Sequence, residues 1–196
     1  MANSHKVQFG LDQVHYAKVT ETVDSTGKVS YSWGEWKDFP GAVNMTVDNV
    51  ANRAKEYADN VLYHSAVSVP EVDLTFECEL VPDDFKKDVL GYLTATDGSL
   101  IRQVNNIKSK IAIAYRVKGD SKHRIKYYFV CDVADNDQSA STMTDSVAVQ
   151  HATLTLTAYP VEDGAGHVIT TGTIDEGATG YAKFFGTALK LPTYSA

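Results

Sequence analysis

The most regular pattern of apolar and polar positions in this chain spans residues 71–80. Apolar side chains alternate there with polar ones, at Val72, Leu74, Phe76, Cys78 and Leu80. A period of two predicts a β-strand with one buried face. The opposite face carries four carboxylates, at Glu71, Asp73, Glu77 and Glu79. Because carboxylates two positions apart on a strand lie roughly 7 Å from each other and repel, we expect this face to meet water or a basic partner.

Further runs rich in Val, Ile, Tyr and Thr predict a mainly β fold. We expect strands over residues 14–22, 29–36, 42–50, 109–117 and 123–133, and a further long strand within residues 144–160. Single apolar faces are predicted for Val43, Met45 and Val47; for Ile111, Ile113, Tyr115 and Val117; for Ile125, Tyr127, Phe129 and Cys131; and for Leu154 and Leu156. Turn-rich sequences at 23–28 and 118–121 are typical of hairpin connections between two pairs of these strands.

One short α-helix is predicted over residues 82–92. Pro82 suits the first turn, and the two aspartates that follow it suit the N-terminal end of the helix dipole. Phe85, Val89 and Tyr92 recur at helical spacing and form a single apolar stripe. We expect this stripe to pack on a sheet, and Gly91 to end the helix.

Two segments lack clear periodicity. Residues 48–70 mix helix formers with Asn and Asp, and we expect a long inter-strand loop there, with a short helical turn or a hairpin as alternatives. Residues 164–196 are rich in Gly and predict an extended C-terminal arm, with short strands around 168–171 and 181–185. We therefore expect one β-sandwich domain over residues 1–163, followed by this arm.

Charge is strongly segregated along the 196-residue chain. Lys and Arg number 18 and Asp and Glu number 25, which gives a net charge of −7. Residues 71–100 carry 8 acids and 2 bases, residues 101–126 carry 1 acid and 8 bases, and residues 127–196 carry 8 acids and 2 bases. The basic block contains a hairpin set made of Lys110, Arg116, Lys118, Arg124 and Lys126. Either these blocks are solvated faces of neighbouring strands, or acidic and basic surfaces meet between copies of the chain.

The sequence offers little for catalysis or cofactor binding. It contains neither a Gly-rich phosphate or dinucleotide motif nor a nucleophile elbow. The six histidines are scattered, and two cysteines alone make neither a disulfide framework nor a zinc site. We therefore expect no enzyme, catalytic residue, metal or cofactor. The acidic balance argues against a general DNA-coating protein, and we expect neither a membrane span nor a secretion signal.

Several stretches, taken in order, resemble one protein family. They are residues 57–63 (YADNVLY), 72–80 (VDLTFECEL), 85–91 and the later 153–164 (TLTLTAYPVEDG). Over about residues 10–165 the chain is similar to the major tail proteins, or tail tube proteins, of long-tailed phages with non-contractile tails (siphovirus type). Individually these motifs are degenerate, and their order and spacing carry the resemblance.

The resemblance implies a structural virion protein. Its members form hexameric rings that stack into the tail tube, the conduit for genome delivery. The implied subunit is a β-sandwich with one flanking helix, and one of its sheets joins its copies around an acidic lumen. The implied partners are other copies, a tape-measure protein, the tail tip or baseplate, a tail terminator and DNA in transit. The implied location is the phage tail, after synthesis in the host cytoplasm.

The residues themselves leave alternatives open. The carboxylate face could line a lumen, where like charge lets DNA pass without sticking, or it could be an outward-facing solvated strand. The basic hairpin could contact acidic surfaces of the next subunit. Rival functions are a monomeric ligand-binding β-barrel or sandwich, and a carboxylate-based hydrolase.

Overall fold

The protein is mainly β, as the sequence predicts. The computed structural model describes residues 10–58, 61–134 and 151–194, and for residues 51–70 it describes the backbone without the side chains. The elements are β1 (Leu11–Val23), β2 (Val29–Trp33), β3 (Lys37–Asp38), β4 (Ala42–Ala58), β5 (Val61–Cys78), α1 (Asp83–Asp88), β6 (Leu93–Thr94), β7 (Leu100–Ile101), β8 (Ile111–Val117), β9 (Ile125–Val133), β10 (Ala152–Ala158), β11 (Val161–Glu162), β12 (Val168–Ile169), β13 (Thr171–Ile174) and the 3-10 helix η1 (Tyr181–Gly186). No helix in the described part is long and apolar enough to cross a membrane.

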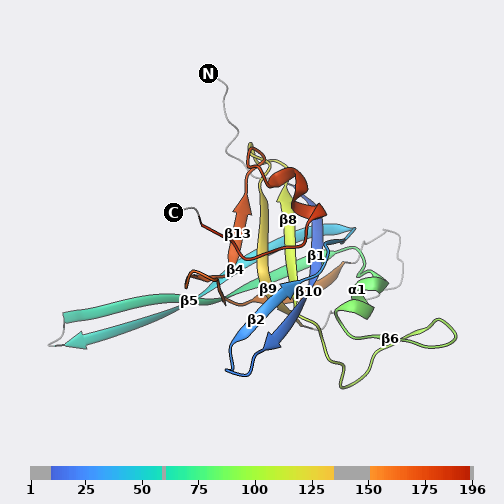
Figure 1. Ribbon diagram of the computed structural model, residues 1–196, viewed down its shortest axis with the longest axis horizontal. Helices are drawn as coiled ribbons and strands as arrows, with labels where there is room; N and C mark the ends of the chain where they lie inside the picture. The colour runs from blue at the N-terminus through green and yellow to red at the C-terminus, as the bar shows by residue number, and fades with distance from the viewer. Residues whose placement is uncertain (1–9, 59–60, 135–150, 195–196) are drawn as a thin grey trace, which may run out of the picture.

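One large antiparallel sheet organises the chain (Figure 1). Its strand order is β2-β1-β8-β9-β10-β5-β4, with β3 beside β1 and β13 beside β9, nine strands in all. One edge of β9 pairs with two strands in turn: its first half pairs with β13 and its second half with β10. β11–β12 and β6–β7 are small two-stranded pairs outside this sheet.

The larger core lies on one face of the sheet, under α1. Its side chains come from β1, β5, β8, β9, β10 and α1. Phe39 contacts the rings of Phe76 and Phe85 edge-on at 5.0 and 5.1 Å. Within the helical stripe, Phe85 and Val89 are buried in this core and Tyr92 packs against it. The helix is shorter than expected, because Pro82 is its extended N-cap and Val89 its C-cap.

A second core lies on the opposite face, beneath the C-terminal segment. Phe129 and Leu189 are buried in it. Phe184 of η1 stacks on Trp36 at 5.6 Å and contacts Tyr127 at 5.0 Å. The C-terminal segment is therefore a layer of this fold. The short strand expected around 181–185 is wrong, since these residues form η1.

A bulge in β9 explains a second wrong prediction. Ile111 pairs with Cys131, whereas Ile113 pairs with Tyr128, so the register shifts between them. Tyr127 and Phe129 therefore belong to the second core, whereas Cys131 belongs to the first. The single apolar face expected for residues 125–131 does not exist, because an inserted residue reverses the alternation.

Over residues 48–70 the expected loop is wrong, and the alternative of a hairpin is confirmed. β4 and β5 pair from Ala42 opposite Cys78 to Ala58 opposite Val61, and their far half leaves the body as a two-stranded arm (Figure 1). Three register shifts interrupt this pairing, between Ala42 and Asn44, Val50 and Asn52, and Glu56 and Tyr57. Bulges of this kind break the period of two that would have revealed the strands.

The bulge nearest the start of β4 also corrects its predicted face. Met45 and Val47 pack against the first core, but Val43 is 41% exposed. At the same end of the pairing, β5 ends at Cys78, opposite Ala42, and Leu80 beyond it is 65% exposed. The alternation predicted over 71–80 therefore holds as far as Cys78.

Gly91, just after α1, has a backbone conformation and a close neighbour that both favour glycine. Its φ is +71°, and a Cβ there would lie 2.9 Å from the carbonyl oxygen of Ile107. Gly98 has a similar φ of +87°, but no atom lies within 4 Å of its Cβ position. We predict that Gly98→Ala lowers the free energy of unfolding by about 1 kcal/mol and Gly91→Ala by roughly 2–3 kcal/mol, measured by urea denaturation. Equal losses would show that the approach to Ile107 has no energetic weight.

Candidate assembly surfaces

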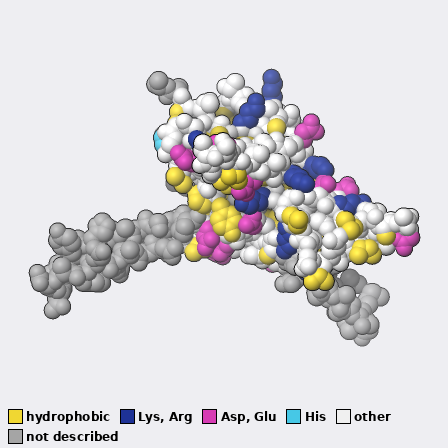
Figure 2. Space-filling view, turned by 60° about the horizontal axis from the view of Figure 1, so that its bottom comes forward, with side chains coloured by type: hydrophobic (Ala, Val, Ile, Leu, Met, Phe, Trp, Pro, Cys, Tyr) yellow, Lys and Arg dark blue, Asp and Glu magenta, His cyan; other side chains and the backbone are white. Residues whose placement is uncertain are grey.

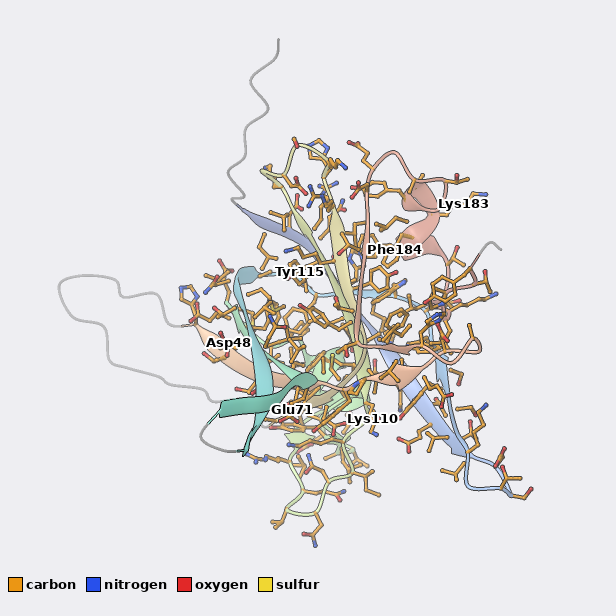
Figure 3. All side chains as sticks on the ribbon, turned by 90° about the vertical axis from the view of Figure 1, so that its left-hand side faces the viewer. Asp48, Glu71, Lys110, Tyr115, Lys183 and Phe184 are labelled. Atoms are coloured by element: carbon orange, nitrogen blue, oxygen red, sulfur yellow. The ribbon has the colours of Figure 1, made fainter. Side chains whose placement is uncertain are left out.

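The acidic face predicted from the sequence lies on a partly exposed sheet surface made by β4, β5 and β10. Thr157 and Asp48 flank Asp73 on the two neighbouring strands. Thr153 and Asn44 flank Glu77 in the same way. Because residues paired across strands point to the same side of a sheet, the face is polar across all three strands. Figure 3 shows Asp48 and Glu71 at this sheet.

The structure brings together three of the four predicted carboxylates. Glu71, Asp73 and Glu77 lie on one face of β5, alternating with buried residues. The hydroxyl of Thr157 donates a hydrogen bond to Asp73 at 2.9 Å. Glu79 lies beyond the strand end, where its backbone N–H donates to the Gly41 carbonyl at 2.8 Å. It therefore adjoins the face without belonging to the strand.

Two further carboxylates join this face, and the sequence analysis missed both. Asp48 lies directly opposite Asp73. Asp132 lies opposite Thr157, one strand further across. Burial raises the pKa of Tyr159, and the charges of Asp132 and Glu71 raise it further. Both carboxylates therefore lie close enough to Tyr159 to act on its hydroxyl. Asp132 stands between two buried apolar residues of β9, an alternation that could have revealed it. Figure 2 shows acidic side chains gathered near the base of the arm.

The basic hairpin is largely neutralised within its own chain. Arg116 donates two hydrogen bonds to the Asp12 carboxylate, at 2.9 and 2.8 Å. These bonds lower the pKa of Asp12 and raise the pKa of Arg116. Lys110 donates to Glu21 at 2.7 Å, which raises the pKa of Lys110. The predicted contact of these side chains with another subunit must therefore compete with partners already in place.

The remaining hairpin cations differ from one another. Arg124 Nε lies 3.1 Å from an oxygen of the buried Asp120 and 3.4 Å from Asp175, so it joins β9 to the segment after β13. Lys118 and Lys126 make no ion pair within the described residues. Lys126 lies at a groove of about 380 Å³ between β4 and the ends of β1, β8 and β9, whose apolar lining includes Met45 and Tyr115.

The ends of the large sheet are open. β2 ends the strand order on one side and β4 on the other, and neither has a second partner strand among the described residues. Exposed strand edges present unpaired N–H and C=O groups that can pair with another chain. Within the described residues, no group of three or more His, Cys, Asp or Glu side chains is placed to hold a metal ion.

Comparison with known proteins adds little. No protein-family model matches the chain, and no curated protein matches its sequence. Among solved structures, the chain has a likeness to Hcp1 from Salmonella typhimurium, with 10% sequence identity and a TM-score of 0.30. The match covers 84% of this chain and 95% of Hcp1. Superposition at this level supports no conclusion about function.

The like-charged pair on the acidic face should weaken the isolated subunit. Asp48 and Asp73 are directly opposed across β4 and β5. We predict that Asp48→Asn raises the free energy of unfolding by about 0.5 kcal/mol at low salt, because it removes this repulsion, and that the gain shrinks at about 1 M salt. Glu35→Gln, at an exposed acid between β2 and β3, is the control and should change little. A salt-independent gain would mean that repulsion is not its cause.

The Asp12–Arg116 pair should make stability depend on pH. Because Arg116 lowers the pKa of Asp12 in the folded protein, the stabilisation is complete above the unfolded-state pKa of about 4 and is lost as pH falls through the lower folded value. We predict that Asp12→Asn lowers the free energy of unfolding by about 1–2 kcal/mol at pH 7. Unfolding curves of wild type and variant should converge toward pH 2. A constant difference would exclude this titration.

Proposed function

We propose that this protein is a structural subunit that assembles with its own copies into stacked rings, and that these rings form the tube of a phage tail. The observation that carries the proposal is the β4–β5 arm. A two-stranded hairpin is at best marginally stable in water without packing on a further layer. The arm, which is the far half of the β4–β5 pair, extends away from the body, and no other described strand or helix packs against it (Figure 1). A neighbouring copy would supply that layer.

The open sheet edges support the same proposal. β2 and β4 end the strand order, so a copy on each side could continue the sheet. Closing a series of copies into a ring removes both edges, which are otherwise sites of uncontrolled pairing. A hexamer is the ring that the sequence resemblance implies.

The acidic face supports a role as a conduit. Glu71, Asp73, Glu77, Asp48 and Asp132 share the surface made by β4, β5, β10 and the end of β9. A surface of this charge repels phosphate and offers no Lys or Arg to replace the counter-ions condensed on DNA. If this face lines the tube, the genome passes without binding. The same proposal includes a tape-measure protein in the lumen, tip and terminator proteins at the ends, and a place in the virion.

Removing the arm tests assembly. We predict that replacing residues 51–70 with an Asn-Gly turn, which joins Val50 to the paired Glu71, leaves the body folded, because all the described side chains of both cores lie outside the deleted segment. The wild-type protein should form rings or tubes in negative-stain micrographs, and the shortened one should sediment as a monomer with an unchanged thermal midpoint. A wild type that stays monomeric when concentrated would contradict the proposal and favour a ligand-binding β-sandwich.

Charge reversal tests the conduit. We predict that Glu71→Lys with Glu77→Lys leaves tube formation intact and makes the tubes retain short fluorescent duplex DNA at about 50 mM salt, with release at higher salt. Asp73 is spared because it accepts the Thr157 hydrogen bond. Glu35→Lys with Glu162→Lys is the matched control, since both acids are exposed and lie elsewhere. Loss of assembly in the first variant alone would place this face in a subunit interface.

A further inference from the structure

A pocket of about 400 Å³ lies between β13 and the C-terminal segment. Its floor is apolar, with contributions from Tyr127, Ile174, Phe184 and Leu189, and its basic residues are Lys183 and Lys190. Figure 3 shows Lys183 and Phe184 on η1. The pocket and the acidic face share only β9, which lines the pocket with Tyr127 near its start and joins the acidic face with Asp132 near its end.

The walls of this pocket are fixed by tight packing. A Cβ at Gly172 would lie 2.2 Å from the Tyr127 ring, so only glycine lets that ring lie against the β13 backbone. Phe184 then packs on Tyr127 from η1, at 5.0 Å between ring centroids. Tyr181 of η1 donates a hydrogen bond to the His123 carbonyl at 2.6 Å and ties the same segment to the start of β9. The pocket is therefore preformed.

The charge of the pocket stands out against its surroundings. Residues 127–196 carry 8 acids and 2 bases, and the 2 bases are Lys183 and Lys190. Both side chains are exposed, and neither has a hydrogen-bond or ion-pair partner among the described residues. Two unpaired ammonium groups above an apolar floor select a segment that carries both carboxylates and large apolar side chains.

We propose that this pocket receives the tip of the β4–β5 arm from a second copy of the chain. Residues 56–63 read EYADNVLY. They hold two acids, Glu56 and Asp59, no Lys or Arg, and the apolar or aromatic side chains of Tyr57, Val61, Leu62 and Tyr63. This composition complements both the floor and the rim of the pocket.

The length of the arm makes the contact intermolecular. From Val50 to Ala58 the strand continues for 8 residues, which is roughly 26 Å at about 3.3 Å per residue. The arm points away from the body, whereas η1 lies on it (Figure 1). Arm and pocket are different surfaces of one subunit, so the contact is heterologous and generates rings or filaments. The inference rests on the proposed self-assembly and adds to it the receptor for the arm.

Disulfide trapping tests the contact directly. The native cysteines, Cys78 and Cys131, are both buried, so introduced surface thiols can be read without interference. We expect a mixture of Glu56→Cys and Lys183→Cys proteins to give a disulfide-linked heterodimer under mild oxidation, at least tenfold above the yield with Lys28→Cys in place of Lys183→Cys. Lys28 is exposed and lies in the β1–β2 turn. A yield equal to this control overturns the inference.

Charge exchange gives the second measurement. Lys183→Glu with Lys190→Glu, and separately Glu56→Lys with Asp59→Lys, should each abolish the trapped heterodimer and the tubes, and the combined variant should restore both. If the lysine variant fails to assemble but the tip variant assembles normally, another ligand occupies the pocket and the inference is wrong. Tubes without trapping would refute the arm contact alone, whereas trapping without tubes would refute the tail tube proposal alone.

Discussion

Burial of the central strands on both faces is the constraint from which the rest of the structure follows. Ala112 and Ala114 of β8 are fully buried, and β9 sends Tyr128 to one core and Phe129 to the other. A strand in this position cannot face water on either side, so the chain must supply a layer above and a layer below. α1 lies on one side, and the C-terminal segment lies on the other. The bulge in β9 changes which residues serve which core, because it directs Cys131 to the first core after Phe129 has joined the second.

A centre held in this way leaves the outer strands free for other tasks. β4 and β5 contribute Met45 and Phe76 to the first core near the body, and beyond Glu71 they continue as a hairpin alone. We therefore expect the body to be stable without the arm, which leaves the arm free to serve as a contact surface. Charge follows the same division. Arg116 and Lys110 bind acids of their own chain at the sheet, whereas Lys183 and Lys190 at the C-terminal pocket have no ion-pair partner in the part of the chain that the structure describes.

The sequence predicts the elements whose alternation is unbroken, and fails where a bulge interrupts it. β10 and the body half of β5 keep a strict period of two, so their buried and exposed faces were assigned correctly as far as Cys78. Between β4 and β5 three register shifts obscure two strands of 17 and 18 residues, and in β9 one shift divides an apparent single face between two cores. Of the acidic face, the β5 residues were predicted, but Asp48 and Asp132 come from other strands. Their addition depends on strand pairing, which local sequence does not specify.

The opposition of Asp48 and Asp73 bears on function because folding alone would not select it. Like charges directly across a strand pair destabilise a sheet, and Thr157 offers Asp73 only one compensating hydrogen bond. The neighbouring positions on β10 show that neutral side chains fit this surface, since Thr153, Thr155 and Thr157 occupy it without charge. The proposed conduit accounts for an acidic patch at positions where neutral residues also fit, because a surface of this charge repels a polyanion that moves past it.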